Sequence, residues 1–321
     1  MEITEVTLLD GRTPARGSVA GGTGIIIRGN NLMYNNVYSD GINTYHEIER
    51  LTFSGGQSIN SMISLNLQSQ KYKIKYKFGN DALTINSQIT VFGSDSPISS
   101  EDFGLRKGSI ISSINYIQLL IGSSLYQFIP AVILDNLPHI FDWNLTSQNK
   151  GTLDNIYQTK AITTEIISNY PIILGIQSGY FRGDIYSFKI WNFDELVRDM
   201  IPVINIATNK GGMWDKVSGT FFGNNGAGQI LPNQTINVMI DIAGTPTHCT
   251  DIAAINNNTI ICNVPIHNAG NYSITVDNGV ENTTMNNAFE YVPCLAQKTA
   301  NGYNPLKMKH AGGDWDILLK Q

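Results

Sequence analysis

The chain has 321 residues, of which 42% are hydrophobic and only 15% are charged, and its formal net charge is −5. This length exceeds that of a typical single domain, so two domains are expected. Because few residues are charged, Asn, Ser, Thr and Gly must supply the polar surface, and these turn-forming residues indicate an all-β protein. A mildly acidic chain lacks the positive field that binds phosphate backbones, so we expect no nucleic acid as a partner.

The beginning of the chain has no features of a secretory signal, because residues 1–5 are acidic and already alternate like a strand. The stretch nearest to a membrane span, residues 117–134, is interrupted by Gly122, Gln127 and Pro130. We therefore expect a protein without a membrane span that is made in a cytoplasm.

Short alternating segments lie near both ends of the chain. Residues 3–9 and 24–28 are predicted strands at the N-terminal end. Further predicted strands, separated by turn residues, follow residue 234 at 235–242, 259–264, 272–276 and 288–292. The two pieces sum to about 100 residues, the size of one immunoglobulin-like sandwich, and neither alone supplies two sheets. We predict one sandwich from residues 1–34 and 229–292, interrupted by a domain at residues 35–228.

The outer pieces resemble a TIG (IPT) domain. The turn at residues 21–23, the strand after it and the turn at residues 29–32 match the usual opening of such a domain. Residues 270–276 and Phe289-Glu290-Tyr291 match its closing strands. The resemblance implies an Ig-like sandwich whose surface loop after Leu32 holds the insertion, as loop tips do when the guest's ends lie close together.

Cys249 and Cys262 lie where the resemblance often places a pair of cysteines. Two interpretations stay open: a disulfide, or two buried free thiols as synthesis in a cytoplasm favours. His248 and His267 lie nearby, but the chain has no CxxC and no paired histidine spacing, so neither a metal nor another cofactor is predicted.

The inserted residues 35–228 are also rich in predicted strands and have the size of a lectin-type jelly roll. Lysines alternate with Tyr and Ile over residues 71–77, which indicates a strand with one solvated face. Only residues 163–168 and 194–196 look like short helices. The predicted fold class is therefore all-β, an Ig-like sandwich with an inserted jelly-roll sandwich.

A second resemblance lies within residues 183–224. The segments 183–191, 196–203 and 211–224 are similar to the C-terminal signature of laminin-G-like, concanavalin-type jelly rolls common in bacteriophage structural proteins. The resemblance implies a virion setting. Within it, Arg198 beside Asp199 is interpreted as a structural ion pair at the start of a strand.

Catalysis is not expected. Glycoside hydrolysis requires two closely spaced carboxyl groups, and the Glu-x-Asp-x-x-Glu pattern that would supply them on one strand is missing. Glu47 and Glu49 share one strand face, but beside Arg50 they are better explained as solvated charges. The histidines lie near no serine elbow.

Carbohydrate binding is the candidate activity. Aromatic rings stand beside polar residues at 141–145 and 178–182, and sugar sites combine an aromatic face with amides and carboxylates. The candidate sugar contacts are Asp142, Trp143, Asn144, Tyr180 and Arg182. The alternative is that Trp143 fills the core of the sandwich.

The predicted strand pattern stops after Pro293, so residues 293–321 are expected to be an irregular tail. The tail ends in an apolar cluster, formed by Trp315, Ile317, Leu318 and Leu319. This cluster docks either on its own sandwich or on a neighbouring subunit.

These features lead to the hypothesis of a non-enzymatic bacteriophage virion protein, an accessory component of a fibre, tail or capsid surface. Its partners would be other virion proteins, further copies of itself and host-surface glycans. Two alternatives stay open: a capsid decoration protein with no ligand, and a bacterial surface adhesin, which the lack of an export signal disfavours.

Overall fold

The structure is a computed structural model. It describes residues 1–34, 36–80, 82, 89–94, 103–107, 116–128, 135–144, 150–159, 167–175, 181–240, 246–293, 296–299, 302–305, 307–309 and 315–317. The chain divides into two compact units, one formed by residues 1–35 with 234–321 and the other by residues 36–233. Nearly all the regular structure is β, as the composition predicts.

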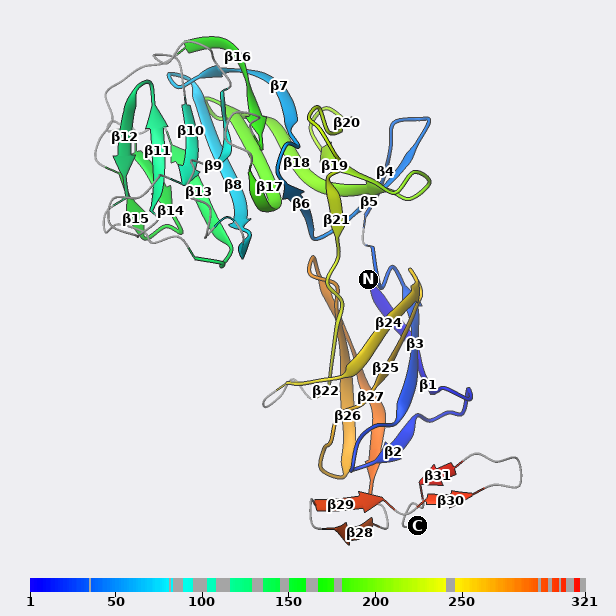
Figure 1. Ribbon diagram of the computed structural model, residues 1–321. Coiled ribbons are helices and arrows are strands. Elements are labelled where there is room, and N and C mark those ends of the chain that lie inside the picture. Colours follow the sequence, from blue (N-terminus) through cyan, green and yellow to red (C-terminus); the bar gives the residue numbers. More distant parts are fainter. Residues whose placement is uncertain are drawn as a thin grey trace. The chain divides into compact units, whose positions relative to one another are not determined.

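Unit 1 is an Ig-like sandwich of two sheets (Figure 1). The four-stranded sheet has, in spatial order, β1 (Glu2–Leu8), β3 (Gly24–Asn30), β25 (Thr259–Asn263) and β24 (Thr250–Asn256). The five-stranded sheet has β2 (Arg16–Ser18), β27 (Asn282–Val292), β26 (Gly270–Asp277), β22 (Asn237–Ile240) and β23 (Thr247–His248).

The two ends of the chain meet inside the four-stranded sheet. Strand β3 pairs antiparallel with β25, and Ile27 lies opposite Ile260. Both side chains are fully buried, as is Ile25. On the other side of β3, a Cβ atom on Gly29 would lie 2.0 Å from the carbonyl oxygen of Glu2, so β1 can approach this closely only because residue 29 is glycine. The core of unit 1 therefore requires both segments.

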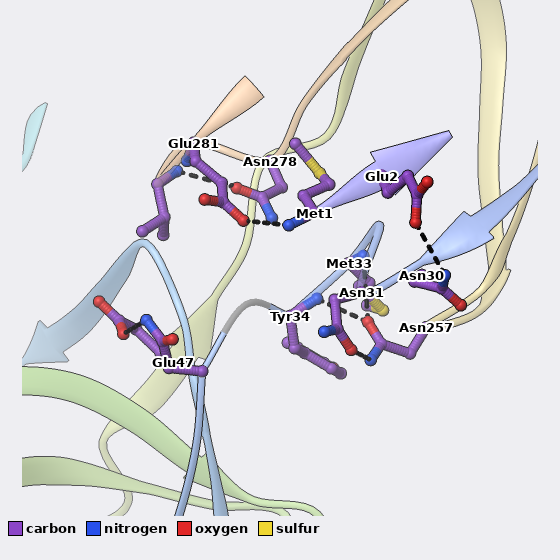
Figure 2. A network of polar contacts seen from close by, with 12 residues as sticks. Met1, Glu2, Asn30, Asn31, Met33, Tyr34, Glu47, Asn257, Asn278 and Glu281 are labelled. Atoms are coloured by element: carbon purple, nitrogen blue, oxygen red, sulfur yellow. Dashed lines mark hydrogen bonds and ion pairs between the residues drawn. The ribbon is translucent and has the colours of Figure 1, made fainter. Parts of the chain in front are cut away.

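The segment that leaves unit 1 after β3 is held by the turn between β24 and β25 (Figure 2). Asn257 Oδ1 accepts hydrogen bonds from the main-chain N–H groups of Met33 at 3.1 Å and Tyr34 at 2.7 Å. Its amide nitrogen donates to Asn31 Oδ1 at 3.2 Å. One asparagine thus fixes three of the last residues before the insertion.

The returning segment is held by the turn between β26 and β27. The side-chain amide of Gln234 donates to the carbonyl oxygen of Asn278, whose own side chain accepts from the N–H of Glu281 at 3.0 Å. The Glu281 carboxylate pairs with the amino group of Met1 at 2.7 Å (Figure 2). The chain therefore leaves unit 1 and returns to it at two segments that are hydrogen-bonded to turns of unit 1.

The observed return to unit 1 lies at residue 234, five positions beyond the expected 229. The reason is strand β21 (Leu231–Asn233), which pairs antiparallel with β6 (Arg50–Ser54) of unit 2.

Unit 2 contains a six-stranded and a twelve-stranded sheet. The six-stranded sheet has, in spatial order, β12 (Ser124–Gln127), β11 (Ile117–Ile121), β10 (Phe103–Lys107), β9 (Ile89–Ser94), β16 (Ile167–Leu174) and β7 (Ile59–Asn66).

The twelve-stranded sheet has a central path and side branches. The path is β15 (Tyr157–Gln158), β14 (Lys150–Leu153), β13 (His139–Asn144), β8 (Gln70–Phe78), β17 (Arg182–Asn192), β18 (Glu195–Asn205), β19 (Lys210–Asp215) and β20 (Thr220–Phe222). The branches are β4 (Val37–Ser39), β5 (Thr44–Glu47), β6 and β21.

Aromatic rings join the two sheets of unit 2. Phe92 of the six-stranded sheet lies 5.5 Å from Phe188 and 5.6 Å from Phe141 of the other sheet, measured between ring centroids. Strand β8 shows the predicted alternation, with Tyr72, Ile74 and Tyr76 buried and its lysines partly exposed. Unit 2 is thus a jelly-roll-like sandwich, and the predicted fold class is confirmed.

Two local predictions are wrong. Residues 195 and 196 belong to strand β18, not to a helix, and Ile167 and Ser168 belong to strand β16. The tail is not irregular either. It forms two small hairpins, β28 (Ala296–Thr299) with β29 (Gly302–Pro305) and β30 (Lys307–Lys309) with β31 (Trp315–Ile317).

We expect Ile27→Ala and Ile260→Ala each to lower the free energy of unfolding by about 2–5 kcal/mol, because each leaves a cavity in the core of unit 1. The double variant should depart from additivity by about 0.5–3 kcal/mol, since the two residues face each other across β3 and β25. Urea unfolding of the unmodified protein, the two single variants and the double variant measures the loss of stability and the departure from additivity. Strictly additive effects would contradict the shared core.

Candidate functional site

The candidate site lies beside β7, the strand that ends the six-stranded sheet as described. Side chains from other elements bond to the main chain in and next to this strand. Asn224 Oδ1 accepts from Ser58 N–H at 3.0 Å, and Asn225 Oδ1 accepts from Asn60 N–H at 3.3 Å. These bonds protect a strand edge that would otherwise attract other strands.

Arg198 of β18 also bonds to this strand. Its Nε donates to the Ser61 carbonyl oxygen at 3.1 Å and its Nη1 to the Val197 carbonyl oxygen at 2.8 Å. The guanidinium group stands over the ring of Phe222, 5.5 Å from the ring centroid. The main chain and the ring therefore fix the plane of the group.

The ion pair expected between Arg198 and Asp199 does not form. Neighbouring strand residues point to opposite faces, so Asp199 pairs with Lys189 at 3.1 Å, while Arg198 Nη1 lies 3.5 Å from Asp215 Oδ2. Asp215 is fully buried, and its carboxylate accepts four hydrogen bonds, from the N–H groups of Asp199, Val217 and Ser218 and from the hydroxyl of Ser218. This carboxylate thereby shapes the β19–β20 turn.

Together these elements enclose an open hollow of about 520 Å³, which we call the Arg198 groove. Its described lining residues are Asn60, Met62, Arg198, Ser218, Thr220, Phe221, Phe222, Gly223, Asn224 and Asn225. Met62 is 63% exposed although it is a large apolar residue, and its φ of 58° lies in the left-handed region, where long side chains are rare. The groove thus combines apolar and aromatic walls with amide and guanidinium groups.

Three lining side chains keep N–H groups without a partner among the described residues. They are the Nη2 group of Arg198 and the side-chain amide nitrogens of Asn60 and Asn225. Asn224 differs, because its amide nitrogen already donates to the carbonyl oxygens of Gly226 and Gly228. The groove therefore offers hydrogen-bond donors to a ligand.

The sugar contacts expected from the sequence are not brought together. Asp142 of β13 pairs with Lys73 of β8 at 3.4 Å, whereas Arg182 opens β17 next to Gly183, which lies opposite Phe78 of β8. Lys73 and Phe78 are five residues apart, roughly 17 Å along the strand. The side chain of Asn144 and the whole of Tyr180 lie outside the described residues.

Trp143 is a core residue, as the alternative interpretation held. Its side chain is fully buried and packs edge-on against Phe103, with the ring centroids 5.8 Å apart. A ring without exposed surface cannot stack on a sugar. Asp142, its neighbour on β13, points to the opposite, partly exposed face.

His139, the first residue of β13, has a structural role. The two ring nitrogens of His139 lie 2.8 Å from Asp154 Oδ2 and 2.9 Å from Asp135 Oδ1, and the side chain is buried. Asp154 also accepts from the Ile140 N–H at 2.7 Å. These contacts tie the β13–β14 hairpin to the segment before it.

Cys249 and Cys262 are both free and buried in the core of unit 1. Their side chains contact each other, and the hydrogen bond with Cys249 together with burial raises the pKa of the Cys262 thiol. Trp315 and Ile317 lie in β31, and Leu318 and Leu319 lie outside the described residues.

In the described part of the chain, no cluster of His, Cys, Asp and Glu has the geometry of a metal site. A helix with the length and apolarity to cross a membrane is not found there either.

The sequence analysis missed the Arg198 groove. It treated residues 211–224 only as a mark of the fold and Arg198 only as half of an ion pair. The consecutive Asn224 and Asn225 before Gly226 were a local signal, since such a run marks a turn rich in amide groups.

We expect Asn224→Ala to lower the free energy of unfolding by about 1–3 kcal/mol, because the Ser58 N–H and two main-chain carbonyls lose their partner. The variant should also self-associate, since the edge of β7 is less protected. Asn225→Ala is the matched control, because the Asn225 side chain accepts one main-chain hydrogen bond, from the Asn60 N–H, and donates to no carbonyl among the described residues. Denaturation and light scattering measure the two effects. Equal stability of both variants would contradict the protective role of Asn224.

We expect neither Cys249 nor Cys262 to react with iodoacetamide in the folded protein at about pH 8, because a buried thiol with a raised pKa supplies little thiolate. Both should react once urea unfolds the chain. Mass spectrometry of peptides containing each residue measures the labelling. Peptides that remain joined in urea and separate only after reduction would reveal a disulfide instead.

Comparison with known proteins gives one family match. The IPT/TIG domain family matches residues 217–291, which is less than a quarter of the chain. No curated protein matches the chain. The match supports the Ig-like character of the C-terminal segment of unit 1.

Several solved structures are similar to parts of the chain. A heptameric SAP-like pentraxin from Limulus polyphemus has 10% identity and a TM-score of 0.33, and the match covers 44% of this chain and 75% of the pentraxin. Domains LG4-5 of the mouse laminin alpha1 chain have 7% identity and a TM-score of 0.30, with 78% of each chain covered. The botulinum neurotoxin serotype D binding domain has 10% identity and a TM-score of 0.27, covering 85% of this chain and 94% of that domain. These values are too low to assign a relative.

Proposed function

We propose that this protein is a non-catalytic attachment protein that binds carbohydrate in the Arg198 groove. The groove supports this proposal through its mixture of groups. Phe222 and Met62 offer apolar surface to the C–H faces of a sugar ring, while Asn60, Asn225 and Arg198 offer N–H groups to its oxygens. A volume of about 520 Å³ suits a mono- or disaccharide.

Binding is favoured over catalysis by the titratable groups of the groove. Among the described lining residues, Arg198 is the one with an ionisable side chain, and arginine stays protonated at all ordinary pH values. It can orient an oxygen but cannot exchange a proton as a general acid or base.

The finer proposal is an accessory virion protein of a bacteriophage, located on a fibre, tail or capsid surface and serving host attachment. It rests on the resemblance of residues 183–224 to phage jelly rolls and on the combination of an Ig-like unit with an inserted sandwich. Mass spectrometry of purified particles tests it: the protein should be present, and its absence would exclude the virion setting.

We expect the full chain to bind a subset of sugars on a glycan array, and Phe222→Ala to weaken that binding about tenfold or more, because the variant removes an aromatic wall of the groove. Phe193→Ala is the matched control, since Phe193 is 62% exposed and lies outside the groove. Circular dichroism shows whether both variants stay folded. If the full chain binds no glycan, the protein is better explained as a decoration protein without a ligand.

A further inference from the structure

Apart from the lone pairs of the Ser218 and Thr220 hydroxyls, the side-chain groups of the Arg198 groove that keep hydrogen-bonding capacity are mainly donors. The side-chain oxygens of Asn60 and Asn225 are already used as acceptors, by the N–H groups of Met62 and Asn60. The nitrogen donors that remain are the amide nitrogens of these two residues and Nη2 of Arg198. A neutral sugar presents hydroxyls that both donate and accept, whereas a donor-rich site is better matched by a ligand that mainly accepts.

Arg198 is paired with the buried Asp215 and still keeps its Nη2 group for a ligand. Its nearest carboxylate, Asp215, lies at 3.5 Å, is fully buried and is occupied by four other hydrogen bonds. The Arg198 side chain retains 16% of its surface and lies at the wall of the groove. Because the described lining residues include no carboxylate, an anion entering the groove meets no repulsion from them.

The guanidinium group is fixed before any ligand arrives. Hydrogen bonds to Ser61 and Val197 and the contact with the Phe222 ring hold its plane. A donor group that is already fixed loses little entropy when it binds a carboxylate, and charge-assisted hydrogen bonds are among the strongest in proteins. One cation suits a single negative charge better than a phosphate or sulfate cluster.

We infer that the Arg198 groove selects sugars that carry a carboxylate, with the carboxylate bound by Arg198 and the amide groups of Asn60 and Asn225. This inference rests on the proposed carbohydrate binding and adds the class of sugar. Uronic acids and sialic acids share this chemistry.

The test compares each acid with its uncharged counterpart on the unmodified full chain, by calorimetry or surface plasmon resonance. The probes are sialyllactose with its methyl ester and a glucuronate disaccharide with its methyl ester, and lactose serves as the neutral reference. At least one acid should bind about ten- to a hundredfold more tightly than its ester, the effect of one or two charge-assisted hydrogen bonds. Raising NaCl from about 50 to about 500 mM should weaken the acid and leave the ester unchanged.

Two variants locate the effect. Arg198→Gln should bring the acid down to the affinity of its ester, while Met62→Ala, which removes apolar surface of the groove but none of the contacts that hold the guanidinium group, should weaken acid and ester by the same factor. If Arg198→Gln does not fold, the comparison of acid and ester on the unmodified chain still decides. Equal affinity for acid and ester, or tighter binding of neutral sugars, would overturn the inference and leave carbohydrate binding intact. Binding of no sugar at all would overturn both.

Discussion

The pairing of β3 with β25 is the constraint on which the rest of the structure depends. It joins residues more than two hundred positions apart, and Ile25, Ile27 and Ile260 are all buried in the core of unit 1. The entropy of closing so long a loop grows slowly with its length, so a large guest adds little to the cost. The insertion does require that the segments before and after it stay attached to unit 1. Hydrogen bonds to Asn257 hold the first segment, and a hydrogen bond to Asn278 holds the second.

In unit 2, protection of a strand edge and construction of a groove use the same side chains. The amide of Asn224 bonds entirely to its own turn and to Ser58, the residue before β7, whereas Asn225 and Arg198 each bond to β7 and keep an unpaired donor. A capped edge resists pairing with another strand, which favours small ligands over strand addition at this site. The stability of the sandwich and the chemistry of its groove are therefore coupled through a few amides.

Much of the fold could be predicted from local patterns. The alternation of apolar and polar residues correctly predicted β3, β8 and β25, because in a half-buried strand every second side chain faces the core. The same rule, applied strictly, would have separated Trp143 from Asp142 and Arg198 from Asp199, since neighbours on a strand face opposite ways. The groove could not be predicted, because it depends on which residues of β7, β18 and the segment after β20 meet in space, and no local pattern reports that.

The first residue of the family match also shows that local sequence alone does not determine which segments meet in space. A comparison that reads contiguous sequence begins the IPT/TIG match at residue 217, although residues 217–233 belong to unit 2, where β21 pairs with β6. In residues 220–224, as in residues 24–30, a short strand is followed by Gly-Asn. Only the strand of residues 24–30, β3, pairs with β25. The two stretches are similar in sequence, but each lies in a different unit. Contacts decide between them: β3 brings two fully buried isoleucines into the core of unit 1, while Phe221 packs on Tyr45 of unit 2, with stacked rings 4.5 Å apart.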